Sequence, residues 1–568
     1  MERGGSPWST VRAERLLVIA VHNVTAATRL VDVLPLIAGD SRVQVRFAVT
    51  GSSAFTDGTA GFLSAMGADP VDWTTAVELR PDLVISASHG GDLREPGAPV
   101  IIFPHGVGYN KYLDPGTQEP RNPGTPVFGL SPEWLLDADG GVIPSVLVLS
   151  HAEQVDRLAS ACPEAVPVAV VAGDPCLDRI LASLPLRAVY RSALGADGRT
   201  VVVVSSTWGR ESLFGTDPGF VARLAARLPV DRYRVVLVLH PNVSAWHSRW
   251  QVETWLRECA RAGVAVLDPV EGWRAALVAA DLVIGDHGSV SLYAAAAGRP
   301  LALAVAPEST VDPLSAIGRM LAVTPRIAVD DDVAARVDEL AGRPVSPELA
   351  AVAELASSGR GESARLLRAA LYGLIDLPEP PEPADATAVP VPPPASDRGR
   401  SHLVTATIIA VTEDSAEVEL VRYPAPRLRD WVGGSAHLVV GLAEPYRRWL
   451  DLAEVVIVDR SPADAAAVLA SLPGCLLAAV SDGPPTVLVA DGTRVRFTEV
   501  TGDGDPHPDT AALCASAVHC WLVDGRALAD LPRLLRLRVG GRVRRVEVGE
   551  LARQPGPVVR EDLGLGDG

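Results

Sequence analysis

Short runs of consecutive apolar residues recur along the first two thirds of the chain. Unbroken apolar runs, rather than strict alternation with polar residues, are typical of strands buried on both faces of a parallel sheet. The runs are LLVIAV at 16–21, VQVRFAV at 43–49, DLVISAS at 82–88, VIIFP at 100–104, SVLVLS at 145–150, VPVAVV at 166–171, VVVVSS at 201–206, RVVLVLH at 234–240, VAVLD at 264–268, DLVIGD at 281–286 and LALAVA at 301–306.

Longer Ala-, Leu- and Arg-rich segments separate these strands and predict helices. Examples are AGFLSAMGA at 60–68, PGFVARLAARL at 218–228 and WQVETWLRECARAG at 250–263. The alternation predicts an α/β fold of two Rossmann-like domains that face each other across a cleft. We expect the first domain at 1–185 and the second at 186–376, with closing helices from 346 onward.

A proline-rich stretch follows the second predicted domain. LPEPPEPADATAVPVPPPAS at 377–396 contains eight prolines and little that could pack, so residues 377–400 are predicted to form an extended, semi-rigid linker. Beyond it, 401–568 mixes alternating strand patterns with the helix-like PADAAAVLASL at 462–472. We expect an accessory α+β domain there, with no recognisable chemistry.

Length and charge limit the classes of function. A chain of 568 residues suggests about three domains. Its formal net charge of −18 disfavours nonspecific binding to nucleic acid, and it disfavours attachment to an anionic membrane through a polybasic patch. A local basic pocket remains compatible with that charge.

The cysteines indicate neither a disulfide framework nor a metal site, because the six are scattered without paired spacing. In CASAVHC, Cys514, His519 and Cys520 are interpreted as ordinary helix packing. We expect no metal and no cofactor. Since no apolar run is long enough to cross a bilayer or to form a signal-peptide core, we expect a cytoplasmic protein. Peripheral attachment to the inner membrane face and the oligomeric state are left open.

The stretch FPHGVGYNKY at 103–112 contains Lys111, the single lysine of the chain. Everywhere else the protein uses arginine for positive charge. An ammonium group is a compact point charge whereas a guanidinium is a planar fork, so a phosphate site can accept one and not the other. Survival of one lysine by chance is the alternative.

Four loops after predicted strands carry groups suited to a nucleotide diphosphate, and loops at this edge of a parallel sheet are where ligands bind. A lone histidine is often structural, and Ser or Gly before a helix is an ordinary cap, so each loop is a weak signal by itself. The second loop is expected to begin a helix whose free N–H groups favour an anion. The candidate residues are His105, Gly106 and Lys111 in the first loop, Ser205, Ser206, Thr207 and Trp208 in the second, His240 in the third, and Asp286, His287, Gly288, Ser289 and Ser291 in the fourth.

Two further loops offer candidates for an acceptor side. His22 and Asn23 follow the first strand, and His89 lies in SASHGGD. For His22 and Asn23, a role in capping the loop is the alternative. Asp286 is expected to order its own loop rather than to bind a metal, because no second acid stands nearby in the sequence.

In their order, these loops resemble those of the CDP-glycerol glycerophosphotransferases, the teichoic-acid polymerase type within the GT-B fold. PHGVGYNK is similar to that family's W-H-G-T-P-L-K segment, SSTWGR to A-P-T-W-R, LHPN to R-P-H-P, and DHGSVSLYAAAAGRP to its D-Y-S-S segment with the following helix. VAGDPCLDR at 171–179 resembles the G-x-P-x-x-D stretch of GT-B enzymes, including sugar-nucleotide 2-epimerases. The resemblance covers about 15–376.

The resemblance implies specific roles. His105 matches a general base on the acceptor hydroxyl, for which an ordinary histidine pKa is suitable. His240 and Ser289 match residues at the donor phosphates, and Thr207 and Trp208 match the nucleotide side. The family's pattern changes at several positions: the lysine falls one residue later, Pro104 replaces Trp, Gly288 replaces a serine, Tyr293 stands where an acid is expected, and no arginine precedes His240.

Three functions therefore stay open. The first is a transferase that moves glycerol phosphate, or a related polyol or sugar unit, from a CDP-activated or other nucleotide donor to an unidentified hydroxyl acceptor. The second is a nucleotide-sugar glycosyltransferase or a 2-epimerase relative, since the fold does not choose the chemistry. The third is a catalytically degenerate protein that binds a nucleotide.

Overall fold

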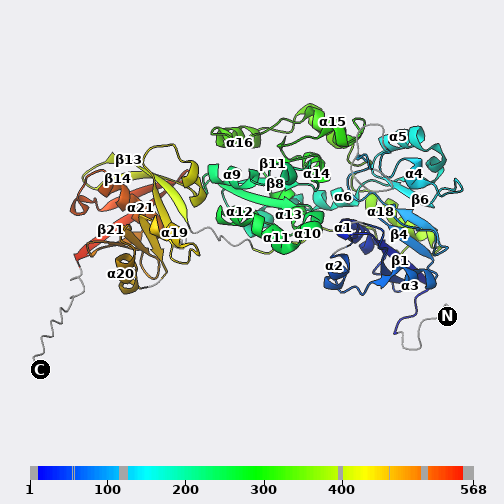
Figure 1. The fold of residues 1–568 in the computed structure, drawn as a ribbon, viewed down its shortest axis with the longest axis horizontal. Coiled ribbons are helices and arrows are strands. Elements are labelled where there is room, and N and C mark those ends of the chain that lie inside the picture. The colour runs from blue at the N-terminus through cyan, green and yellow to red at the C-terminus, as the bar shows by residue number, and fades with distance from the viewer. Residues whose placement is uncertain are drawn as a thin grey trace, which may run out of the picture. The chain divides into compact units, whose positions relative to one another are not determined.

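A computed structural model of the protein describes residues 10–53, 56, 58–113, 126–394, 401–459, 461–500 and 509–553. The chain divides into two compact units. One comprises residues 1–221, 234–257 and 265–395, and the other comprises 222–233, 258–264 and 396–568. Figure 1 traces the chain through its helices and strands.

The first unit begins with a seven-stranded sheet, which we call the first lobe together with its helices. The order β3-β2-β1-β4-β5-β6-β7, in which all the neighbouring strands run parallel, is that of a doubly wound Rossmann-like domain. The central β1 is inaccessible to solvent from Leu17 to Val21, which explains its unbroken apolar run. The strands are β1 (Arg15–Val21), β2 (Val43–Val49), β3 (Val71–Asp72), β4 (Leu83–Ser86), β5 (Val100–Ile102), β6 (Val146–Leu149) and β7 (Ala169–Val171).

A second parallel sheet, with its helices, forms what we call the second lobe. Its order is β10-β9-β8-β11-β12, again with the first strand of the block at the centre. The strands are β8 (Thr200–Ser206), β9 (Tyr233–Leu239), β10 (Ala265–Val266), β11 (Leu282–Gly285) and β12 (Leu301–Leu303). Two Rossmann-like domains in tandem confirm the α/β, GT-B-like fold predicted from the sequence.

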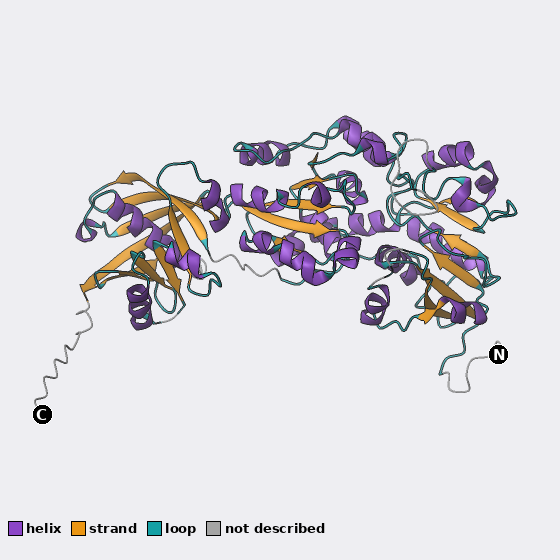
Figure 2. Cartoon of the chain, in the orientation of Figure 1, coloured by secondary structure: helices purple, strands orange, loops and turns teal. Residues whose placement is uncertain are grey.

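Helices connect the parallel strands, and Figure 2 shows them in purple beside the orange sheets. Asn23 begins the first of them by accepting the Ala26 N–H at 2.9 Å, a typical N-cap. The first lobe has α1 (Val24–Val33), α2 (Thr59–Ala65), α3 (Trp73–Glu78), α4 (Pro132–Leu135), α5 (Glu153–Ala161) and α6 (Pro175–Ala182). The second has α7 (Arg187–Ala193), α8 (Leu213–Thr216), α9 (Phe220–Arg227), α10 (Pro241–His247), α11 (Arg249–Trp255), α12 (Arg257–Arg261), α13 (Gly272–Ala279), α14 (Ser289–Ala296), α15 (Ala316–Val323), α16 (Val333–Ala341) and α17 (Pro347–Glu354).

The chain returns to the first lobe through α18 (Ser363–Leu374). Leu367, Leu371 and Tyr372 of this helix lie in one buried cluster with Leu17 and Ile19 of β1. The closing helices predicted from 346 onward are therefore present, and the last of them completes the core of the opposite lobe.

Two expectations about the helices were wrong. Ser205 and Ser206 do not begin a helix: they end β8, and α8 starts only at Leu213 after a loop capped by Ser212. The segment expected as one helix at 250–263 is divided into α11 and α12. Propensity alone did not reveal either boundary, because both depend on the course of the chain after a strand.

The proline-rich stretch has no regular secondary structure between 378 and 394, but it is packed against the first unit. Val389 is 3% exposed, its N–H donates to Ser183 Oγ at 2.9 Å, and its carbonyl accepts from the Tyr190 hydroxyl at 2.7 Å. The expectation that this stretch holds little that packs fails at this valine, since one apolar side chain among prolines is enough to anchor it. Residues 395–400 of the predicted linker lie outside the described residues.

The C-terminal part of the chain folds into a nine-stranded sheet that closes on itself in the order β13-β14-β20-β21-β19-β18-β17-β16-β15. The helix α21 (Thr510–Val523) contacts eight of these strands and is buried along most of its length. The expected α+β composition is confirmed. The other elements are β13 (His402–Val411), β14 (Ser415–Pro424), β15 (His437–Gly441), α19 (Arg447–Asp451), β16 (Val455–Val458), α20 (Pro462–Ser471), β17 (Leu477–Val480), β18 (Thr486–Val489), β19 (Thr493–Glu499), β20 (Leu534–Val539) and β21 (Arg542–Arg553).

No helix in the described part of the chain is both long enough and apolar enough to cross a bilayer.

Candidate functional site

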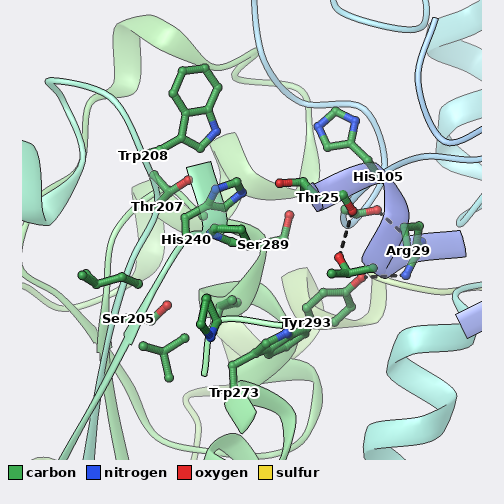
Figure 3. Close-up of a pocket in the computed structure, with 18 of the residues that line it drawn as sticks. Thr25, Arg29, His105, Ser205, Thr207, Trp208, His240, Trp273, Ser289 and Tyr293 are labelled. Atoms are coloured by element: carbon green, nitrogen blue, oxygen red, sulfur yellow. Dashed lines mark hydrogen bonds between the residues drawn. The ribbon is translucent and has the colours of Figure 1, made fainter. Parts of the chain in front are cut away.

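A cavity lies between the two lobes of the first unit, and Figure 3 shows the side chains that line it. Its walls come from α1 and the His105 loop on the first lobe, and from the loops after β8, β9, β10 and β11 on the second. Of the candidates predicted from the sequence, it brings together His105, Gly106, Lys111, Ser205, Ser206, Thr207, Trp208, His240, Gly288 and Ser289. The carboxyl ends of the central strands thus converge as the general rule for such folds requires.

The loop that carries His105 is held against the second lobe. The Val107 N–H donates to Ser289 Oγ at 3.2 Å, and a Cβ placed on Gly106 would lie only 2.5 Å from that oxygen. A side chain at this glycine would push Ser289 away. The glycine in the HGV sequence is therefore required by the close approach of the two lobes.

Lys111 lies further along the same loop and pairs by backbone with Val311 of the second lobe. Its Nζ is 5.5 Å from the centre of the Trp208 ring, a cation–π distance. Within the described residues no carboxylate forms an ion pair with this ammonium group. Burial lowers the pKa of Lys111, while the charges of Asp286 and Glu211 oppose that shift.

Asp286, after β11, organises the loops around Trp208 rather than facing the cavity. Its Oδ2 accepts the backbone N–H of Thr207 at 2.9 Å and of Leu213 at 3.0 Å, and its Oδ1 accepts that of Gly288 at 3.0 Å. Burial raises its pKa, although these three N–H groups act in the opposite direction. The contact with Gly288 lies within the loop of Asp286 itself, as expected, whereas the contacts with Thr207 and Leu213 hold the segment after β8.

The N-terminus of α14 opens into the cavity, beginning at Ser289. This helix has eight residues, and within the described residues no side chain caps its first turn. Ser289 Oγ already accepts from Val107, so its hydroxyl proton is left for another partner. Figure 3 places Ser289 in the middle of the cavity, between His240 and Tyr293.

His240 is the N-cap of α10: its Nδ1 accepts the Asn242 N–H at 3.2 Å. Its backbone N–H donates to the Ser206 carbonyl at 3.0 Å, which ties the loops after β8 and β9 together. Burial, followed by the charges of Lys111 and His105, lowers the pKa of His240 well below its ordinary value. The ring is therefore neutral at physiological pH, with Nδ1 as an acceptor.

The pKa of His105 differs from the ordinary value expected for a base. His105 lines the cavity and is exposed, and its ring meets the Phe128 ring edge-on at 5.2 Å. Desolvation by the surrounding protein, then the charges of Lys111, Arg29 and His22, lowers its pKa to about 4. His105 is thus ready to accept a proton throughout the neutral range.

Five candidates besides His89 lie outside the cavity lining: His22, Asn23, Asp286, His287 and Ser291. His22 Nε2 lies 2.6 Å from the Gly90 carbonyl, and Asn23 caps α1. Ser291 donates to the Asp286 carbonyl at 2.7 Å. His287 is 5% exposed, and burial lowers its pKa well below the ordinary value. These contacts support the capping alternative for Asn23.

His89 is 8% exposed and packs edge-on against Phe128 at 5.3 Å and Tyr109 at 6.0 Å. Burial lowers its pKa to about 3, with His105 and His22 contributing. Like His22, it is absent from the cavity lining and belongs to the aromatic support behind the His105 loop.

Part of the cavity lining was not predicted from the sequence as a binding site. It consists of Arg29, Asp32, Trp273, Arg274 and Tyr293. Buried ion pairs stabilise this part of the cavity: Arg274 Nη2 lies 2.7 Å from Asp32 Oδ2, and Arg29 Nη2 lies 2.7 Å from Asp174 Oδ2. Each acid and its partner are far apart in the chain, so no local motif marked them.

The arrangement suits an anion next to a neutral base. An ammonium group without an ion-pair partner among the described residues, a helix N-terminus and several Ser and Thr hydroxyl groups meet in one cavity, and each favours phosphate oxygens. A histidine with a low pKa stands beside them. Within the described residues no group of His, Cys, Asp and Glu is arranged to hold a metal ion.

No family model matches the chain, and no curated protein sequence is significantly similar to it. Solved structures similar to it include the wall teichoic acid polymerase TagF, at 11% identity and a TM-score of 0.44, covering 64% of this chain and 90% of that one. They also include the UDP-GlcNAc 2-epimerase from Neisseria meningitidis bound to UDP-GlcNAc, at 13% identity and a TM-score of 0.38, covering 63% and 99%. A further example is S. aureus MnaA with UDP, at 12% identity and a TM-score of 0.39, covering 65% and 99%. Both protein types named from the sequence are thus among the similar structures.

Proposed function

We propose that the first unit is a transferase that binds a nucleotide-diphosphate-linked donor in the cavity between its lobes and transfers part of it to a hydroxyl acceptor. The observation that carries the proposal is the ammonium group of Lys111, which lies over Trp208, has no ion-pair partner among the described residues, and lines the same cavity as the N-terminus of α14. An uncompensated buried cation is unfavourable unless an anion offsets it. A diphosphate supplies that anion.

The donor most consistent with the ordered loop motifs is CDP-glycerol or a related CDP-polyol. In this reaction the acceptor oxygen forms a bond to the phosphorus atom that carries the glycerol. The bond from that phosphorus to the oxygen bridging to CMP breaks, and CMP leaves. His105 takes the proton of the acceptor hydroxyl. Lys111 and Ser289 offset the negative charge that develops on the leaving phosphate.

A nucleotide-sugar transferase is the second candidate, because Tyr293 occupies the position at which the resembled family has an acid. In that case the acceptor oxygen attacks the sugar carbon, and a nucleoside diphosphate leaves. The two reactions release different nucleotides, so a product assay distinguishes them.

The test begins with a thermal-shift screen of the full chain against CDP-glycerol, UDP-GlcNAc and a GDP-sugar, because a true ligand stabilises the folded protein by mass action. The donor that binds is then incubated with candidate polyol and sugar acceptors, and the nucleotides released are separated. We expect CMP from CDP-glycerol. Release of UDP from UDP-GlcNAc would assign the glycosyl reaction, and binding without release would assign a nucleotide-binding protein.

Lys111→Ala and Lys111→Arg serve as matched variants in this screen. Lys111→Ala should abolish the shift given by the donor, and Lys111→Arg should weaken it, because a planar fork does not replace a point charge at this position. Trp255→Ala, in a partly exposed ring outside the cavity, is the control. Equal shifts in the wild type and Lys111→Ala would overturn the placement of the diphosphate.

A further inference from the structure

Arg29 of α1 is 4% exposed, and each of its five N–H donors has a protein acceptor. Nε donates to the Pro104 carbonyl at 2.9 Å. Nη1 donates to Asp174 Oδ1 at 3.1 Å and to the Tyr293 hydroxyl at 3.3 Å. Nη2 donates to Asp174 Oδ2 at 2.7 Å and to the Gly106 carbonyl at 3.5 Å. Although Arg29 lines the cavity, it has no donor left for a ligand.

The two carbonyl groups that Arg29 binds stand on either side of His105. One guanidinium therefore holds the peptide plane that precedes His105 and the plane between Gly106 and Val107. A guanidinium with five donors on three nitrogens holds both carbonyls, both oxygens of the Asp174 carboxylate and the Tyr293 hydroxyl at once, and the three donors of a lysine cannot make all five bonds. Arg29 therefore acts on His105 through the backbone of the neighbouring residues Pro104 and Gly106.

Tyr293 brings the second lobe into this arrangement. It lies on α14, is 2% exposed, and donates its hydroxyl proton to Asp174 Oδ2 at 2.8 Å. The same helix begins at Ser289, which accepts the Val107 N–H. A single helix of the second lobe therefore holds the His105 loop at two points, once directly and once through Arg29. Figure 3 shows the dashed contact between Arg29 and Tyr293.

We propose that Arg29, Asp174 and Tyr293 form a positioning clamp through which α14 of the second lobe sets the orientation of His105. Asp174 completes the clamp: it is inaccessible to solvent, caps α6 by accepting the Leu177 N–H at 2.9 Å, and receives both Arg29 and Tyr293. When the second lobe shifts, Tyr293 and Ser289 move together and the hold on the loop is released. The base is then aligned only while α14 keeps these contacts with the first lobe.

The inference rests on the proposed function in one respect, that His105 is the base. The first test is Tyr293→Phe, which deletes the hydroxyl and retains the ring and the charge of Arg29. We expect kcat to fall about tenfold to a hundredfold, as for a slightly misplaced catalytic group, with KM for the donor nearly unchanged. The pH at which activity is half lost on the acid side should stay the same, because Lys111, Arg29, His22 and His89 still face His105.

The second test is Arg29→Met, which removes the clamp and its charge together. Because the charge of Arg29 is one cause of the lowered pKa of His105, the acid limb of the pH profile should move to higher pH in this variant and not in Tyr293→Phe. In Arg29→Ala, added guanidinium ion should restore part of kcat by occupying the vacated position. Arg191→Ala is the comparison: Arg191 binds Asp281 and the Ala279 and Arg199 carbonyls within the second lobe, away from the cavity. Guanidinium should not change its kcat.

A readout independent of turnover separates the clamp from the proposed function. With ¹³C at Cε1 of every histidine, the His105 resonance should shift in Tyr293→Phe, and its titration should move to higher pH in Arg29→Met. The exposed His247 should be unaffected in both. If no donor is turned over but these changes occur, the clamp stands and the function fails. A His105 resonance unchanged in both variants, or full kcat in Tyr293→Phe, overturns the clamp.

Discussion

The Nζ of Lys111 lies 5.5 Å from the centre of the Trp208 ring, although the first residue belongs to the first lobe and the second residue to the second lobe. The contact joins the only lysine of the sequence to a loop that Asp286 organises. The environment of this ammonium group, and with it the pKa of Lys111, therefore depends on both lobes and on any anion that binds between them.

The first prediction uses Lys111 as its own probe. Reductive methylation with ¹³C-formaldehyde labels only Lys111 and the chain's amino terminus, since the sequence has no other lysine. The Lys111 methyl resonance should titrate below the ordinary lysine pKa of about 10.4, because burial disfavours its charged form. Pyrophosphate should raise that pKa. Lys111→Arg removes the signal and confirms its assignment, and a normal pKa that ignores pyrophosphate would contradict the proposed site.

The second prediction concerns the acid limb of activity. His105→Gln should lose about a hundredfold or more in kcat if this residue is the base, whereas His247→Gln, in an exposed ring, should not. A base must be neutral, so activity rises as pH increases through its pKa. With that pKa lowered to about 4 in the free protein, kcat/KM should stay high down to about pH 5. In kcat the limb should lie at higher pH, because bound diphosphate offsets the charge of Lys111. A single limb near 6.5 in both parameters would count against this account.

The third prediction concerns Asp286→Asn. The amide retains one acceptor oxygen, but it cannot accept all three backbone N–H groups, so buried donors at Thr207, Leu213 or Gly288 lose their partner. Each such loss costs about 1–3 kcal/mol. The variant should unfold at lower temperature and lose the stabilisation by donor. Ser291→Ala, which removes only one bond to the Asp286 carbonyl, should do neither to the same extent. Equal melting and equal donor shifts in the two variants would refute the role.

The repeated strands of the two lobes were predictable because each carries its own signal, a short apolar run buried on both faces. The edge of the sheet at which the loops gather follows from the same pattern, and it placed His105, Lys111, His240 and Ser289 in one cavity. Arg29 and Tyr293 were not predictable as a pair. They are 264 residues apart, and their contact exists only once the lobes meet.

Closure of the C-terminal sheet was unpredictable for a related reason. The antiparallel hairpin of β13 and β14 joins neighbouring segments, and the alternation of apolar and polar residues in each segment predicts a strand. The parallel pairing of Ser415–Leu420 with Leu534–Val539 joins segments more than a hundred residues apart. Loop closure over that distance leaves no periodicity in either segment. Likewise α21, almost wholly apolar, predicts burial but does not identify the strands around it.

The fourth prediction concerns the proline-rich stretch. Val389→Asp places an unpaired carboxylate in a buried cluster and should destabilise the first unit by several kcal/mol. It should also expose residues 378–394 to limited proteolysis. Val391→Asp is the matched control, two residues further on and 51% exposed. We expect the control to melt with the wild type. If both variants melt together, Val389 is not an anchor, and this stretch behaves as the simple linker that its composition predicts.

The fifth prediction concerns acid stability in the C-terminal sheet. His437 and His519 stack with ring centres 4.2 Å apart, and His437 Nε2 lies 2.9 Å from Ser516 Oγ. Burial, then the proximity of His519, lowers the pKa of His437 to about 3, and burial lowers that of His519.

Below the ordinary histidine pKa of about 6.5 the unfolded chain binds protons that the folded form does not. The contribution of His437 to stability should therefore be complete above pH 6.5 and decline as pH falls from 6.5 towards 3, by about 1.4 kcal/mol per pH unit. Hydrogen exchange of the α21 amides in the full chain measures this locally. Exchange between pH 7 and pH 5, corrected for its intrinsic pH dependence, should reveal a loss of protection in the wild type that is smaller in His437→Gln. Equal losses in the two proteins would assign the acid sensitivity to other groups.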